Sequence, residues 1–222
     1  MLFPRLTQLD LTAPLEVFGR MAGVEISLIW KTLDPVASDR GLRLLPTHTF
    51  EAAPALDLIC VPGGPGQIDL MDDAETLAFL RAMAPKCRWV TSVCTGSLVL
   101  AAAGLLTGYR ATSHWSSIDQ LALFGATPVS ERVVRDRNRI TGAGVTSGID
   151  FGLAVAAEVL GAEAASRIRL QIEYDPPALP GGSPATADPA VLTPVQQAMA
   201  GFIAKRRAAS EAAARRLHAH QT

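Results

Sequence analysis

The 222-residue chain has only three cysteines, at irregular spacing, and almost no excess charge of either sign. Three scattered cysteines make neither a disulfide framework nor a metal cluster, and they suit a reducing cytoplasm. A net charge of -1 argues against bulk nucleic-acid binding, because phosphate contacts need a clustered excess of Lys and Arg. No apolar run approaches the roughly 18 residues that span a bilayer, and no signal peptide precedes the first folded element. We therefore expect a cytoplasmic protein with a small ligand, no bound nucleic acid and no membrane contact.

Hydrophobic residues make up 49% of the chain, enough to fill a sizeable core. Short β-branched runs alternate along the sequence with helical segments. This alternation predicts an α/β fold with a parallel sheet covered by helices on both faces. Strands are expected over residues 24–30, 58–61, 88–93 and 139–141. Helices are expected over residues 13–22, 74–84, 117–124, 146–160 and 163–173, the first of them capped by Thr12.

The two ends of the chain depart from this alternation. Residues 1–4 have the composition of the last part of a strand but are shorter than the roughly five residues of a central parallel strand, so we expect a weakened sheet there. Residues 175–192 are rich in Pro, Gly, Ser and Ala, and predict a loop between an α/β domain over 1–174 and a helical extension over 193–222. Apolar residues at helical spacing predict that the extension packs on the domain or on a dimer partner: Val195, Met199, Phe202 and Ile203. A solvated end beyond Arg206 is the alternative.

Cys94 lies where a strand-like run breaks into a Thr-Gly-Ser turn and an Ala- and Leu-rich segment. This pattern is typical of a nucleophile elbow at the carboxyl edge of a sheet, where open α/β folds place their sites. Because a helix N-terminus carries unsatisfied N–H groups and partial positive charge, the position favours the reactive thiolate. The alternative is a buried cysteine that only packs. Cys60 and Cys87 lack such a turn and are expected to be structural.

Three further segments follow predicted strands and are expected to converge on this cysteine. Asp10 lies between leucines, so burial and the like charge of a thiolate should raise its pKa and let it donate a proton. A surface or helix-entry aspartate is the alternative interpretation of Asp10. Gly63 and Gly64 could offer backbone N–H groups to an anion. His114 could serve a Cys-His pair, but beside Trp115 a packed and hydrogen-bonded structural role is favoured.

Several motifs together resemble the DJ-1/PfpI superfamily, over nearly the whole chain. They are Phe3-Pro4, Gln8 to Pro14 (QLDLTAP), Val61-Pro62-Gly63-Gly64, Thr91 to Ser97 (TSVCTGS), Ala111 to Trp115 (ATSHW) and Gly148-Ile149-Asp150. Within the superfamily the likeness is strongest to the isocyanide hydratase branch, through segments 28–31, 131–136 and 171–174. The resemblance implies a flavodoxin-like sandwich of the class I glutamine amidotransferase type, usually a homodimer, that hydrates an isocyanide to an N-formamide without metal or cofactor.

The same resemblance implies roles for single residues. Cys94 matches the nucleophile, Asp10 the acid and Thr95 the neighbouring hydroxyl. Asp10 replaces the Glu of the wider superfamily, which suits the hydratase branch, and Ala143 stands where a glycine is expected, so we expect altered loop mobility or pocket size. The expected substrate-binding or oxyanion-binding residues are Gly63, Gly64, His114, Trp115 and Val145.

The chemistry that these residues allow is covalent hydration. The terminal carbon of an isocyanide is carbene-like, so a Cys94 thiolate can add to it, Asp10 can supply the proton, and water can release the formamide from the resulting thioimidate. Two other classes stay open. One is the sensing domain of an AraC-type regulator, although the residues after the linker are too few for a helix-turn-helix domain. The other is a redox or stress protein in which Cys94 is oxidised.

Overall fold

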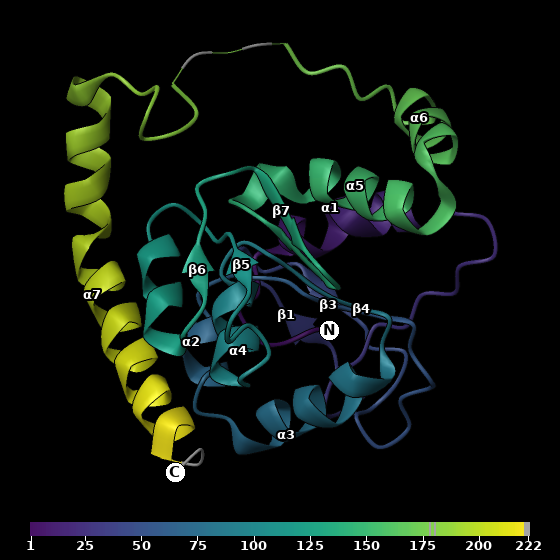
Figure 1. The fold of residues 1–222 in the computed structure, drawn as a ribbon, viewed down its shortest axis with the longest axis horizontal. Helices are drawn as coiled ribbons and strands as arrows, with labels where there is room; N and C mark the ends of the chain where they lie inside the picture. The colour runs from purple at the N-terminus through teal and green to yellow at the C-terminus, as the bar shows by residue number, and fades with distance from the viewer. Residues whose placement is uncertain (178, 180, 220–222) are drawn as a thin grey trace.

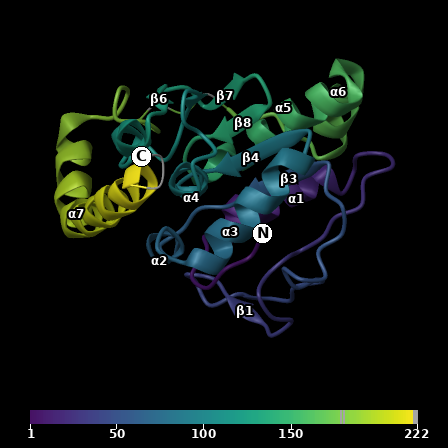
Figure 2. The same ribbon diagram turned by 60° about the horizontal axis from the view of Figure 1, so that its bottom comes forward.

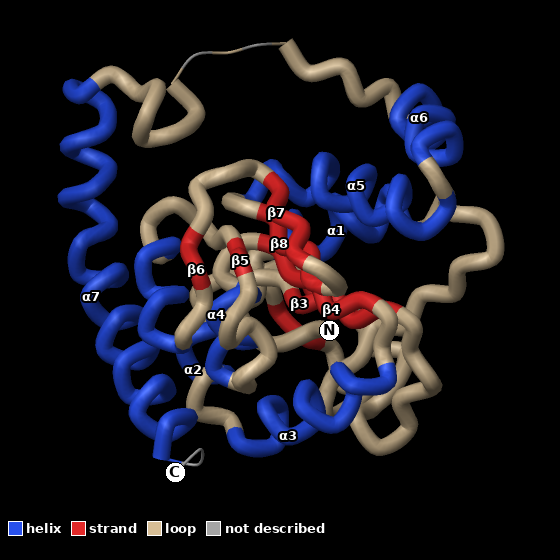
Figure 3. The backbone as a smooth tube through the Cα atoms, in the orientation of Figure 1, coloured by secondary structure: helices blue, strands red, loops and turns tan. Residues whose placement is uncertain are grey.

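The computed structural model describes residues 1–177, 179 and 181–219, and a four-stranded sheet lies at its centre (Figures 1 and 3). The strands stand in the order β3 (Leu58–Val61), β4 (Trp89–Val93), β8 (Arg139–Gly142) and β7 (Val133–Asp136). The first three are parallel, whereas β7 forms an antiparallel hairpin with β8. Every residue of β4 is buried, as a strand with neighbours on both sides requires. The fold is the predicted flavodoxin-like α/β type, with an antiparallel edge strand that the sequence did not predict.

Helices cover both faces of the sheet (Figure 2). α1 (Gln8–Phe18) and α5 (Gly148–Leu160) pack together on one face, and α6 (Ala162–Gln171) packs against α5. Trp89, Val93 and Phe151 fill the core between this pair and the sheet. The other face carries α3 (Ala74–Met83) and α4 (Gly96–Ala102), whose apolar side chains belong to the larger core cluster. The predicted arrangement of helices on both faces of a sheet is therefore confirmed.

The remaining elements are short, apart from the last helix. The short ones are β1 (Val36–Ala37), β2 (Arg43–Leu44), α2 (Gln67–Leu70), η1 (Ala84–Lys86), β5 (Arg110–Ala111), η2 (Ile118–Phe124), β6 (Thr127–Pro128) and η3 (Val145–Ser147). η2 is a 3-10 helix where the sequence predicts a helix over 117–124. α7 (Pro189–Ala219) begins before the predicted residue 193 and lies along the outside of the molecule, against η2, α4 and α2 (Figure 1). No helix among the described residues has the length and apolar character needed to cross a membrane.

The predicted strand over residues 24–30 does not form. Ile29 makes one bridge, to His48, and Val24 is exposed. Segment 1–3 lies beside it instead: the Leu2 N–H donates to the Ile29 carbonyl at 2.8 Å, and the Met1 amine donates to the carbonyl of Cys60 at 2.8 Å. Because the hydrogen bonds between these segments are few, no regular ladder forms at this side of the sheet, and the expected weakening of the sheet stays a prediction.

A mostly apolar cavity of about 550 Å³ lies at this side of the sheet. It is lined by the opening residue, by the irregular segment 22–29, by β3 and by the apolar faces of α1 and α5, including Met1, Leu28, Leu58, Trp89 and Val155. Empty volume among apolar side chains forfeits dispersion contacts. The pocket is partly open to solvent, its lining also includes Glu25, Asp57 and Arg88, and it lies beside the segment where the predicted strand does not form.

The predicted start of the first helix is wrong. α1 begins at Gln8, after Thr7, so Thr12 lies inside the helix and its hydroxyl donates to the Gln8 carbonyl at 3.1 Å rather than capping. Pro14 also lies inside α1, where its ring removes a helix hydrogen bond. Packing of α1 on α5 overrides this local preference for a later start. The earlier start places Asp10 in the first turn.

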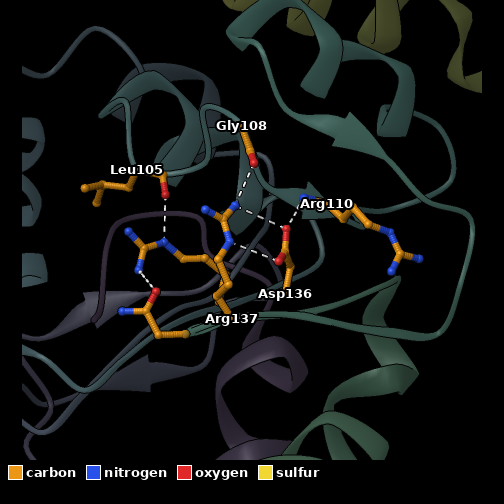
Figure 4. A network of polar contacts seen from close by, with 7 residues as sticks. Leu105, Gly108, Arg110, Asp136 and Arg137 are labelled. Carbon is orange, nitrogen blue, oxygen red and sulfur yellow. Dashed lines mark hydrogen bonds and ion pairs between the residues drawn. The ribbon is translucent and has the colours of Figure 1, made fainter.

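A polar network, which we call the amino-edge network, holds the turn between β7 and β8 (Figure 4). Asp136 accepts the Arg110 N–H at 2.8 Å and the Arg137 Nε at 3.1 Å. Arg137 also donates to the Gly108 carbonyl at 2.6 Å and stacks 3.6 Å from the Tyr109 ring centre. The hydrogen bond from Arg137 holds the pKa of Asp136 below its ordinary value. Because β8 begins here, the network lies at the edge where the parallel strands start.

Candidate active site

The chain turns sharply at Cys94, between the end of β4 and the start of α4. Cys94 adopts a φ of 56°, a left-handed conformation that costs a residue with a Cβ about 1–2 kcal/mol. Its N–H lies 2.9 Å from the carbonyls of both Gly142 and Ala143. Its own carbonyl accepts the hydroxyls of Ser97 and Ser113, each at 3.1 Å. These contacts hold the strained turn, which has the shape of a nucleophile elbow.

The Cys94 side chain is buried, with 4% of the residue exposed. Burial, followed by the charge of Asp10, raises the pKa of the thiol well above its ordinary value, and the Thr95 N–H opposes this only in part. The expectation that the helix N-terminus favours the thiolate is wrong for the resting protein, because desolvation outweighs the N–H groups of a seven-residue helix. The resting group is a thiol that must give up its proton before it can attack.

Asp10 is fully buried in the first turn of α1. Its Oδ2 accepts the Gly63 N–H at 3.1 Å, while Oδ1 has no hydrogen-bond partner among the described residues. Burial raises the pKa of Asp10 to about 7, against the lowering effects of the Cys94 thiol and the Gly63 N–H. The direction matches the sequence prediction. A carboxyl with this pKa can both accept and donate a proton near neutral pH.

Two glycines hold Asp10 and Thr95 in place. The Gly63 N–H goes to Asp10 and the Gly64 N–H goes to Thr95 Oγ1 at 3.1 Å. A Cβ at Gly63 would lie 2.6 to 2.8 Å from the Thr95 nitrogen, the Thr95 hydroxyl and Asp10 Oδ2, so only glycine fits. Their N–H groups thus position the neighbouring side chains in this structure, and the anion-binding role of the two glycines stays a prediction.

His114 and Trp115 flank the site without forming a Cys-His pair in any described contact. The His114 Nδ1 accepts the Ser116 N–H at 3.2 Å and lies 2.8 Å from the Ser116 hydroxyl. Burial, followed by the charge of Arg206, lowers the pKa of His114 to about 4, so the ring is neutral. The Trp115 ring lies 5.5 Å from it, tilted by 34°. These contacts support the structural interpretation of His114.

The loop after β8 closes the other side of the elbow. Val145 begins η3 and packs against the core cluster that contains Cys94. A Cβ at Gly144 would lie 3.1 Å from the His114 ring, so this glycine lets the loop approach the histidine. The Ala143 N–H donates to the Arg132 carbonyl at 2.9 Å, and the Ala143 carbonyl accepts the Cys94 N–H. Val145 therefore lies against the apolar cluster that contains Cys94, and its role in substrate binding stays a prediction.

Sequence reasoning missed Arg206 of α7, which is 5% exposed and hydrogen-bonds Gln67 and Ser117. A signal existed: Arg206 follows Met199 and Phe202 at the spacing of one helix face. A buried arginine on that face could have been singled out.

Two expectations for the last helix are wrong. The packing predicted for Val195 is wrong, because Val195 is 42% exposed. The alternative of a solvated end beyond Arg206 is wrong too, because Ser210 and Ala213 are buried.

No group of three or more His, Cys, Asp or Glu within the described part of the chain is arranged to hold a metal ion. Cys60 lies in β3, and Cys87 is buried after η1. Burial raises the pKa of both thiols. Neither has the turn geometry of Cys94.

Fold and site together define a flavodoxin-like protein with a cysteine at a nucleophile elbow. The DJ-1/PfpI family matches residues 1–158, and the chain belongs to this family. It is 51% identical over 219 residues to the isonitrile hydratase of Pseudomonas putida, covering 98% of this chain and 96% of the hydratase.

A solved structure and a transcriptional regulator are also similar to this chain. The crystal structure of a ThiJ/PfpI family protein from Pseudomonas syringae has a TM-score of 0.91 at 48% identity, covering 94% of this chain and 88% of that one. The HTH-type transcriptional regulator GbdR of Pseudomonas aeruginosa is 34% identical over 168 residues, covering 73% of this chain and 45% of the regulator. This chain is thus similar both to an enzyme over nearly its whole length and to part of a transcriptional regulator.

Proposed function

We propose that the protein is an isocyanide hydratase, an enzyme that adds water to an isocyanide (isonitrile) and releases an N-substituted formamide. The observation that carries the proposal is the 51% identity to the isonitrile hydratase of Pseudomonas putida across nearly the whole of both chains. The site supports it, because a buried thiol and a carboxyl with a pKa of about 7 can exchange one proton at neutral pH.

The first half of the cycle forms a covalent thioimidate. The Asp10 carboxylate takes the proton of the Cys94 thiol, which leaves a thiolate beside a carboxylic acid. The thiolate sulfur bonds to the terminal carbon of the isocyanide, and the electron pair left on that carbon takes the proton from Asp10. The enzyme then holds a thioimidate on Cys94 and an ionised Asp10.

The second half returns the enzyme to its starting state. Asp10 removes a proton from water as the water oxygen bonds to the thioimidate carbon, and the same proton passes to the nitrogen. When the carbon-sulfur bond breaks, the remaining hydroxyl proton returns to the Cys94–Asp10 pair and the formamide leaves. Thr95, whose Oγ1 accepts from Gly64, can still donate its hydroxyl proton to developing charge. Isocyanide and water are the only reactants, and the proposed cycle uses no cofactor.

The test is direct hydration by purified protein. A simple aryl isocyanide is mixed with the protein, and formamide is followed by absorbance and confirmed by mass. We expect turnover by the native protein and a loss of more than about a thousandfold in Cys94→Ala, because the nucleophile is removed. Cys60→Ala is the matched control and should retain turnover with some loss of stability. Equal rates in Cys94→Ala and the native protein would refute the covalent route.

A second candidate function is ligand or redox sensing. The observation that favours it is the match to GbdR, a regulator of which this chain covers 45%. Absence of formamide from folded protein with reduced Cys94 would support sensing. Peroxide titration with mass analysis would then separate an oxidised-cysteine sensor from a ligand sensor.

The expected assembly and compartment are part of the same proposal. We propose a homodimer in the cytoplasm that binds a small isocyanide and neither nucleic acid nor membrane. Light scattering after size exclusion tests the dimer: the mass of a 23.4 kDa monomer at all protein concentrations would refute it.

A further inference from the structure

A buried guanidinium lies where α7 meets the body of the protein. Arg206 is 5% exposed. Its Nε donates to Gln67 Oε1 at 3.0 Å, and its Nη1 donates to Ser117 Oγ at 2.8 Å and, at 3.4 Å, to Ser116 Oγ. Its Cζ also lies 4.6 Å from the centre of the Phe202 ring. All of these partners are neutral.

The acidic groups around α7 are already engaged with other cations. α4 contains no acidic residue. The acidic side chains of α2, of the turn after it and of η2 pair as follows: Asp69 with Arg5, Asp72 with Arg216, Asp73 with Lys31 and Asp119 with Arg207. In the described part of the chain, no ion pair neutralises Arg206. Because an uncompensated buried charge is strongly unfavourable, a negative charge that forms near Arg206 would be stabilised.

Hydrogen bonds connect Arg206 to the elbow. The Ser116 hydroxyl that accepts from Arg206 lies 2.8 Å from the His114 Nδ1. Ser113, the residue before His114, donates its hydroxyl to the Cys94 carbonyl at 3.1 Å. The segment between β5 and η2 therefore contacts both the guanidinium and the backbone of Cys94.

The charges that act on Cys94 are of opposite sign and come from opposite ends of the chain. The Asp10 carboxyl of α1 raises the pKa of the thiol, and the Arg206 charge lowers it. His114, whose Nδ1 lies 2.8 Å from the Ser116 hydroxyl, is neutral because its pKa is about 4. Arg206 is thus the cation of α7 whose charge acts on the Cys94 thiol, while the other charge that acts on Asp10 is the carboxyl of Asp39, which raises the pKa of Asp10.

We propose that Arg206 is a positioning residue for hydration, whose fixed charge favours the thiolate of Cys94 over the thiol. This inference rests on the proposed function. Loss of the thiol proton places a negative charge on sulfur, and a fixed positive charge on the adjoining segment stabilises that charge. Arg206 acts through its field and makes no contact with the reacting atoms. α7 is then part of the active site and not only a cover for the core.

The first test is the chemistry of the thiol itself, which does not depend on hydration. The rate of Cys94 alkylation by iodoacetamide is measured by peptide mass spectrometry between pH 6 and 9 in Arg206→Met, Arg206→Lys and Arg207→Gln. We expect about a three- to tenfold slower reaction in Arg206→Met, with its pH curve displaced to higher pH, because less thiolate forms. Arg206→Lys should restore most of the rate. Arg207→Gln removes a neighbouring exposed charge and should match the native protein.

The second test uses hydration of an aryl isocyanide. In Arg206→Met the acid limb of kcat/KM should move to higher pH, and in Arg206→Lys and Arg207→Gln it should stay in place. Where Arg206→Met does not fold, as judged by circular dichroism, Gln67→Glu replaces it: a carboxylate beside the guanidinium cancels its charge and should produce the same displacement.

The outcomes separate the two proposals. Equal alkylation curves in the native protein, Arg206→Met and Gln67→Glu would overturn the role of Arg206. Faster alkylation in Arg206→Met would overturn it too, since α7 would then only shield the thiol. If the native protein hydrates no isocyanide, the proposed function fails, yet the alkylation curves still decide whether Arg206 controls the thiol.

Discussion

Asp10 and Asp136 are the same residue type at opposite edges of one sheet, in opposite surroundings. At the carboxyl edge Asp10 is fully buried, has one N–H donor and no cation in contact among the described residues, and its pKa rises to about 7. At the amino edge Asp136 accepts from Arg137 and from the Arg110 N–H, and its pKa falls. One edge keeps a carboxyl ready to exchange protons, and the other uses a permanent anion to hold a turn.

The largest expected difference between the two edges is in kcat, when the same substitution is made at Asp10 and at Asp136. Asp10→Asn removes the proton acceptor and donor and should lower kcat for isocyanide hydration by about 10²–10⁴-fold. It should either prevent the thioimidate or let it accumulate, which intact-protein mass spectrometry distinguishes. Asp136→Asn should leave kcat unchanged. An unchanged kcat in Asp10→Asn would refute its role as acid and base.

Stability should respond to the same two substitutions with opposite signs. The pKa of Asp10 is higher in the folded than in the unfolded protein, so its contribution to stability is complete below its ordinary pKa of 3.8 and is lost as the pH rises to about 7. Asp10→Asn should therefore increase the free energy of unfolding at pH 8 by up to about 4 kcal/mol, and have little effect near pH 4.

Asp136 follows the reverse rule. Its pKa is lowered by folding, so its contribution is present above its ordinary pKa and lost as the pH falls below it. Asp136→Asn should decrease the free energy of unfolding at pH 7 and matter less in acid. Urea titrations at pH 4, 6 and 8 measure both effects. Destabilisation by Asp10→Asn at pH 8 would contradict the assignment of Asp10 as a strained, poorly solvated carboxyl.

A methyl group should also act differently at the two edges. Gly63→Ala places a Cβ within 2.8 Å of Asp10 Oδ2 and closer still to Thr95, so both must shift, and kcat should fall about 100-fold. Gly108→Ala meets no atom within 4 Å and costs only the strain of its φ of 73°. It should lower stability by about 1 kcal/mol and leave kcat intact. Steady-state kinetics measure kcat of both variants. A Gly63→Ala variant with the native kcat would contradict the expected difference between the two edges.

The smallest effect is expected at Arg137. Arg137→Met removes its pairing with Asp136, its hydrogen bond to the Gly108 carbonyl and its contact with the Tyr109 ring. Since the side chain is 57% exposed, solvent screens these contacts, and we expect only a small decrease in Tm at unchanged kcat. A large loss of activity would mean that the two edges are coupled.

Much of the site could be predicted because its signals are local. The strand, turn and helix around Cys94 lie within about a dozen residues, so composition and turn chemistry predict the elbow that the structure contains. Asp10 lies between leucines, and the predicted rise of its pKa agrees with the buried carboxyl of the structure. Strands β3, β4 and β8 also appear where their β-branched residues predict them.

The failures depend on distant contacts. The Cys94 pKa depends on how completely the finished core excludes water, which a helix N-terminus in the sequence does not reveal. Residues 24–30 have the composition of a strand, but a strand needs a partner, and segment 1–3 offers few hydrogen bonds. Arg206 contacts Gln67 and Ser117, far away in sequence, so its burial follows only from the docking of α7.

The docking of α7 has a consequence for how the protein is made. Synthesis runs from the N-terminus, so the ribosome releases Asp10 first, then Cys94, and Arg206 only after the whole sheet has emerged. A nascent chain that has already folded its sheet still lacks the cation of α7. On the proposal above, the positive charge that lowers the pKa of the Cys94 thiol is absent until the last helix docks, so the thiol of a nascent chain lacks the gain of about three- to tenfold in reactivity that we expect from Arg206.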